Sequence, residues 1–142
     1  MGEPFEDVKK TIEEELKRLA KKEQDDAKDA DKLVKEQADL EKNKNPSSDE
    51  KKRLGDIRKT LQNILNLCQA DAKGSCNRIN QILKTKVPDD EKTIPIWQKG
   101  MEKWYRDRIE KDPGLDLGHG VKLKGDLSIK DKQATISVGG KF

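Results

Sequence analysis

The chain of 142 residues has the length of one typical domain, but only 31% of its residues are apolar and 42% are charged, so we expect a single thin core. Its two Phe, two Trp and one Tyr argue against a deep aromatic pocket for a small molecule. No run of 18 apolar residues occurs, and the first residues lack the pattern of a secretion signal. We therefore expect a soluble chain without a membrane span.

The charges are nearly balanced along most of the chain. There are 31 Lys and Arg against 28 Asp and Glu, a net charge of +3. Residues 1–96 carry 21 charges of each sign, whereas residues 97–142 carry 10 basic and 7 acidic side chains. This balance does not indicate a nucleic-acid binder by composition. An anionic partner such as RNA would meet the basic C-terminal third.

The first predicted element is a helix over about 5–44, a segment without Gly or Pro and rich in helix formers. Its apolar residues step by three and four and recur about every eleven, a spacing typical of a nearly straight coiled coil. Residues 21–26, which are all polar or charged, interrupt this stripe, so we expect a bend or a frayed stretch there. The first half of the stripe is a candidate binding face, formed by Phe5, Val8, Ile12, Leu16 and Leu19.

A second helix is predicted over 48–71. Asn45-Pro46 ends the first helix, and Ser47 with Glu50 forms a capping box for the second. Apolar residues then follow at intervals of three and four, at Leu54, Ile57, Leu61, Ile64 and Cys68. Two such helices joined by a short connection pack as an antiparallel hairpin.

Shorter elements complete the prediction. Gly74 as a stop and Ser75 as a cap predict a third helix over 76–87, and a fourth follows over 96–111. From Leu117 the apolar period changes to two, with Gly125-Asp126 and Asp131-Lys132 between the runs, which predicts a small meander. The expected fold is therefore mostly helical α+β, with a charged helical region (1–88) and a helix plus antiparallel β-meander (89–142) packed on it.

The two cysteines, Cys68 and Cys76, leave two alternatives open. A disulfide between them would close a short loop and point to a secreted or periplasmic protein. Two buried free thiols would instead favour the cytoplasm. Two Cys and one His are too few ligands for a closed structural zinc site, so we expect no metal and no cofactor.

His119 is the single histidine and lies between Gly118 and Gly120. As a general acid or base, it would need cations to stabilise an anionic transition state, and the candidates are Lys122, Lys124 and Arg106. Metal-independent RNA cleavage needs such a set. No second catalytic group has a defined spacing from His119, which favours the alternative of an exposed histidine in a glycine turn.

The predicted helices carry apolar stripes and the predicted sheet has exposed edges, whereas the sequence contains no catalytic motif. We therefore expect a non-enzymatic interaction protein. The hairpin, or an exposed sheet edge anchored by Phe142, would dock a protein partner or a second copy of the chain. The alternative is the C-terminal domain of a secreted or contact-delivered antibacterial toxin, with metal-independent RNase activity in residues 96–142. The charge step at residue 97 and His119 favour that alternative.

Overall fold

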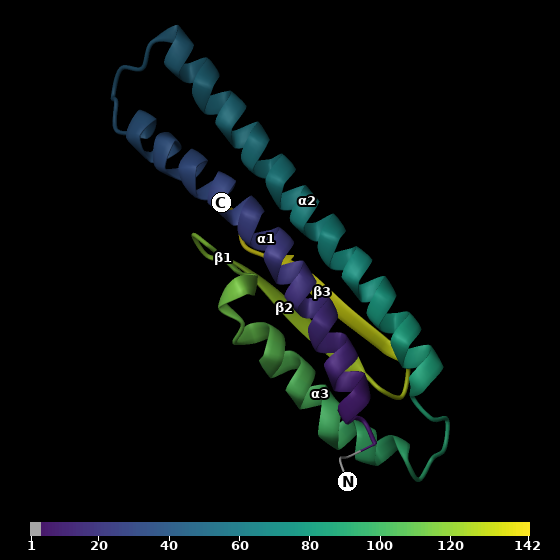
Figure 1. Ribbon diagram of the computed structural model, residues 1–142. Helices are drawn as coiled ribbons and strands as arrows, with labels where there is room; N and C mark the ends of the chain where they lie inside the picture. The colour runs from purple at the N-terminus through teal and green to yellow at the C-terminus, as the bar shows by residue number, and fades with distance from the viewer. Residues whose placement is uncertain (1–3) are drawn as a thin grey trace.

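The computed structural model describes residues 4–142, and within them the chain forms three α-helices and one three-stranded antiparallel sheet (Figure 1). The predicted class, mostly helical α+β, is confirmed. The elements in chain order are α1 (Glu6–Glu41), α2 (Ser48–Lys86), α3 (Ile94–Glu110), a 3₁₀ turn η1 (Pro113–Leu115), β1 (Asp116–Gly118), β2 (Val121–Ser128) and β3 (Gln133–Gly139).

The capping box at the start of α2 is confirmed. The Ser47 hydroxyl accepts the Glu50 N–H at 3.2 Å, and the Glu50 carboxylate accepts the Ser47 N–H at 3.3 Å. These two bonds satisfy backbone donors that a helix start leaves open. They fix the start of α2 directly after the short connection from α1.

The predicted break at Gly74 is wrong. α2 runs without interruption through Gly74 and Ser75 to Lys86, so the predicted helices 48–71 and 76–87 are one element. The Ser75 hydroxyl does not cap a helix but donates to the Glu15 carboxylate on α1 at 3.1 Å. A glycine costs a helix interior only about 1 kcal/mol. Burial of Ile79 and Leu83 beyond it outweighs that cost.

α1 is also continuous, so the bend or fraying expected at 21–26 does not occur. The first half of its apolar stripe is buried in the core of the chain itself, at exposures of 6% or less for Phe5, Val8, Ile12, Leu16 and Leu19. The face expected to seek a partner is therefore occupied internally. A substitution such as Leu16→Asp would place a charge in this core and test folding rather than binding.

The turn expected at Gly125-Asp126 is wrong, whereas the turn at Asp131-Lys132 is confirmed. β2 continues through Gly125 because α3 packs directly on that glycine, and a Cβ there would overlap the Ile109 side chain. The strand order is β1-β2-β3, and the register of the long pair places Leu123 opposite Val138.

The three helices cover one face of the sheet. α2 packs on β3 and α3 on β2, while α1 runs between them and contacts η1 and β1 (Figure 1). One continuous core draws side chains from all three helices and all three strands. The far end of the α1–α2 hairpin extends beyond the sheet (Figure 1).

Candidate functional site

His119 lies in the two-residue turn between β1 and β2. His119 and Gly120 have φ values of 54° and 81°, as a tight hairpin turn with positive φ at both positions requires. The His119 Nε2 lies 2.9 Å from the Asp31 Oδ1 of α1. Lys35 also pairs with Asp31, at 2.9 Å, and hydrogen bonds from Lys35 and then from His119 lower the pKa of Asp31. The histidine therefore joins the sheet to α1.

The other candidates for RNA cleavage lie elsewhere. Arg106 and Lys124 line one shallow hollow between α3 and β2, together with Glu110 and Gly125. Lys122 and Lys124 alternate with buried residues of β2, so neither side chain enters the core. His119 reaches α1 on the helix side. The structure thus brings Arg106 beside Lys124 but does not join His119 to them.

The outer edge of β3 is covered at two positions by α2. The Asn80 Oδ1 accepts the Ala134 N–H at 2.6 Å, and the Cys76 thiol lies beside the backbone of Ile136. Such contacts remove donors that an incoming strand would use. Phe142, the proposed anchor of such a strand, is half-buried and lines a hollow on the hairpin with Leu61 and Leu65.

Both cysteines are free and buried, which confirms the alternative of two buried thiols. The other alternative, a disulfide, is wrong because Cys68 and Cys76 are eight residues apart on one continuous helix. Eight residues of α-helix rise ~12 Å, whereas a disulfide requires Cα atoms within about 7 Å of each other.

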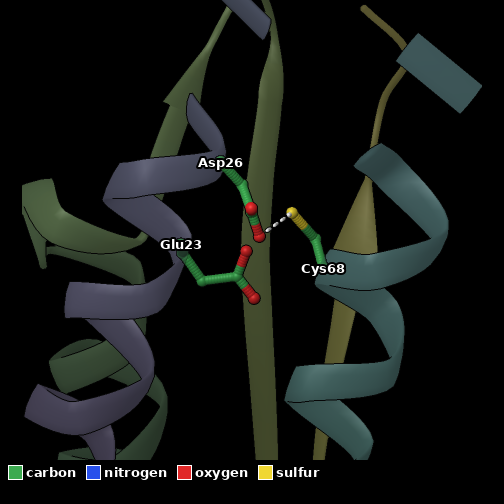
Figure 2. Close-up of side chains that lie close together, drawn as sticks. All are labelled: Glu23, Asp26 and Cys68. Atoms are coloured by element: carbon green, nitrogen blue, oxygen red, sulfur yellow. Dashed lines mark hydrogen bonds between the residues drawn. The ribbon is translucent and has the colours of Figure 1, made fainter. Parts of the chain in front are cut away.

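A polar cluster that the sequence analysis did not identify lies between α1 and α2. It consists of Glu23, Asp26 and Cys68, whose ligand atoms all lie within 4.8 Å of one another (Figure 2). The Cys68 thiol donates to the Asp26 Oδ2 at 3.7 Å. Glu23 is fully buried, and neither of its carboxyl oxygens has a hydrogen-bond partner among the residues described.

The electrostatics of this cluster are unfavourable to negative charge. Burial raises the pKa of Glu23 from 4.5 to about 7; the Cys68 thiol opposes this rise, and the charges of Asp26 and Asp71 add to it. Burial likewise raises the pKa of Asp26, and it raises that of Cys68 well above its usual range. Within residues 4–142, Glu23 and Asp26 take part in no ion pair.

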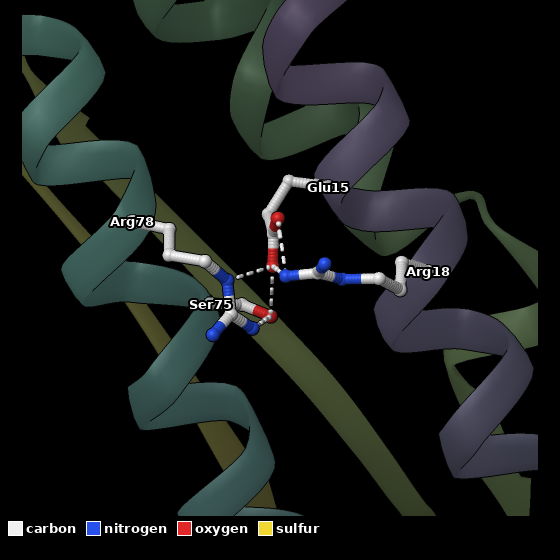
Figure 3. A network of polar contacts seen from close by, with 4 residues as sticks. All are labelled: Glu15, Arg18, Ser75 and Arg78. Carbon is white, nitrogen blue, oxygen red and sulfur yellow. Dashed lines mark hydrogen bonds and ion pairs between the residues drawn. The ribbon is translucent and has the colours of Figure 1, made fainter.

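Glu15, two helical turns earlier on α1, shows how the same interface satisfies a carboxylate (Figure 3). Its Oε1 accepts from Arg78 Nε at 2.6 Å and from the Ser75 hydroxyl at 3.1 Å, and its Oε2 accepts from Arg18 at 3.1 Å. Glu15 therefore has two cations and a hydroxyl, whereas Glu23 has none of these partners.

A sequence feature that could have located the cluster is the position of Glu23. It lies four residues after Leu19 and seven before Ala30, so it continues the buried stripe of α1. The polar run 21–26 therefore contains a buried position of the stripe and does not interrupt it. The more informative observation is that a charged residue, Glu23, occupies a position of the apolar stripe of α1, while the apolar stripe of α2 contains Cys68.

Comparison with protein-family models, curated proteins and solved structures found no match. No helix in the part of the chain that the structure describes is both long and apolar enough to cross a membrane.

Proposed function

We propose that the chain is a non-enzymatic interaction protein that docks a protein partner on the end of its hairpin. The hairpin arm, defined as residues 38–57, comprises the end of α1, the connection and the start of α2. The observation that carries the proposal is that this arm extends beyond the sheet, away from α3 and the strands (Figure 1). An extension of this kind presents a large surface that the core does not need.

Two kinds of contact order the arm: buried apolar side chains between its two helices, and ion pairs across them. Ile57 is fully buried and Leu54 is 9% exposed, although the sheet lies further along the hairpin. At its base, Arg53 binds both carboxylate oxygens of Glu36, at 2.9 and 2.6 Å. Exposed ion pairs add little stability, but a two-point contact fixes how the helices align. A pre-ordered arm docks without the entropic cost of ordering a loop.

The surface of the arm favours a protein over a nucleic acid. Exposed residues of both signs alternate along it, including Lys44, Lys51, Lys52, Asp39 and Asp49. A polyanion would be repelled by the acidic members of this set, whereas a protein surface of mixed charge complements them.

The test compares capture by the parent with capture by two charge-reversed variants. The arm variant carries Lys44→Glu, Lys51→Glu and Lys52→Glu; the matched control carries the same change at exposed Lys73, Lys99 and Lys130. From a nuclease-treated extract, parent and control should retain a protein that the arm variant loses, with affinity about tenfold weaker or more after both partners are purified. Equal binding by the arm variant would refute the proposal, as would a retained component that nuclease destroys.

A second experiment separates this function from the RNase alternative. Purified parent and a His119→Ala variant are incubated with total RNA at low salt without added metal. Because His119 is engaged by Asp31 and separated from Arg106 and Lys124, we expect intact RNA with both proteins. Cleavage by the parent alone would show that the C-terminal region is catalytic.

A further inference from the structure

We propose that Glu23, Asp26 and Cys68 form a binding site for a divalent transition-metal ion of the zinc type, held between α1 and α2 (Figure 2). The site is separate from the hairpin arm and does not rest on the proposed interaction function.

The first argument is the unsatisfied carboxyl group of Glu23. It is fully buried, points into the cluster, and has no hydrogen-bond partner for either oxygen in residues 4–142. Buried polar groups in native proteins are nearly always paired, because leaving one unpaired costs free energy. The surrounding charges, from Asp26 and Asp71, are acidic. The missing partner is therefore a cation, and the matched carboxylate Glu15 has its cations from Arg18 and Arg78.

The second argument is geometric. Glu23 and Asp26 are three residues apart on α1, so their side chains lie on the same face of that helix. Cys68 faces them from α2, with its sulfur 3.7 Å from the Asp26 Oδ2. Sulfur and oxygen ligands of a tetrahedral zinc ion are about 3.5 Å apart, given the usual zinc–ligand distances. The Glu23 carboxyl lies beside both of them, since the three donor atoms are all within 4.8 Å of one another.

The donor set selects the kind of metal. A thiolate with carboxylates suits Zn²⁺, Co²⁺ or Cd²⁺, whereas Ca²⁺ and Mg²⁺ prefer oxygen ligands alone. Three side chains leave one tetrahedral position for water. Asp71, three residues after Cys68 on α2, supplies a further carboxylate at the margin of the site. Asp26 is half-buried and opens the cluster to solvent, which gives the ion an access route.

Binding exchanges protons for the ion. The S–H bond of Cys68 breaks, its sulfur binds the metal as a thiolate, and the proton passes to solvent, as does any proton held by Glu23. Two carboxylates and one thiolate then share a dipositive ion, which offsets most of the buried negative charge.

The experiment titrates Co²⁺ into chelator-treated, reduced protein and follows the absorption of thiolate-to-cobalt charge transfer. The parent should develop this absorption at one ion per chain and lose it when Zn²⁺ is added. The Cys68→Ser variant should not develop it, and Glu23→Gln should bind about tenfold more weakly or worse. Cys76→Ser is the matched control and should behave as the parent, because Cys76 lies eight residues further along α2, against β3.

No charge-transfer absorption in the parent would overturn the proposal, as would its persistence in Cys68→Ser or its loss in Cys76→Ser alone. A second measurement needs no variants. Alkylation of each thiol of the parent is followed by mass spectrometry with and without Zn²⁺. Zinc should slow alkylation of Cys68 severalfold more than that of Cys76. Equal effects on both thiols would refute the site.

Discussion

At the scale of single residues, Glu23 is the least satisfied group described in the structure, and it determines a pH dependence. Its pKa is about 7 in the folded protein and 4.5 when unperturbed, because burial disfavours the carboxylate. Between these values the folded chain keeps a proton that the unfolded chain has released. The free energy of unfolding of the metal-free protein therefore falls as pH rises through this window, by roughly 3 kcal/mol from this group.

Glu23→Gln removes that titration. We expect the variant to be less sensitive to pH between about 4.5 and 7 than the parent, and more stable than the parent near pH 8. Urea unfolding with a chelator present, at a series of pH values, measures the difference between the two proteins. A difference that stays constant with pH would show that Glu23 has the same pKa in the folded and the unfolded chain, and would contradict the effect of burial.

Residue-scale prediction from the sequence succeeded where an interaction is local and failed where it is not. The Ser47–Glu50 capping box spans three residues and was predicted correctly. The partner of Glu15 and the isolation of Glu23 depend on residues some 45 to 63 positions away along the chain. Spacing within one helix carries no information about such distant contacts.

At the scale of elements, continuity of α2 through Gly74 is the main correction. Gly74 lies in the helix interior without positive φ, and a Cβ there would meet only the Arg78 guanidinium at 3.7 Å or more. Gly74→Ala should therefore stabilise the protein by about 0.5–1 kcal/mol, because alanine restricts the unfolded chain. Chemical denaturation with circular dichroism measures the change.

Gly55→Ala is the matched comparison, since Gly55 also lies inside α2 and has open space around its Cβ position. Both variants should gain similar stability. Loss of stability in Gly74→Ala, with a gain in Gly55→Ala, would mean that the helix ends near residue 74 after all.

Glycine misled the element prediction twice, for the same reason. Gly74 resembles a helix stop and Gly125 resembles a turn residue, yet Gly74 lies inside a helix and Gly125 lies inside a strand. At Gly125 the cause is packing, because only a glycine leaves room for Ile109 of α3. The helices, the strand alternation and the hairpin were predictable from the apolar periodicity. Whether an element continues through a glycine depends on the element that packs against it, which periodicity does not reveal.

At the scale of the whole molecule, a chain poor in apolar residues builds one core by placing all three helices on a single face of its sheet. The apolar stripe of α1 is buried in that core, and α2 covers part of the β3 edge. Among the surfaces expected to bind a partner, the hairpin arm takes part in neither of these contacts. The location of the arm, rather than the stripe, therefore supports the proposed function.

The most direct test of that function is amide hydrogen exchange of the parent, alone and with the protein it retains. The account predicts added protection in residues 38–41 and 48–57, because the partner would cover these arm helices, with exchange unchanged in β2 and β3. Protection confined to the sheet, or to α3 around Arg106, with the arm unchanged, would contradict it.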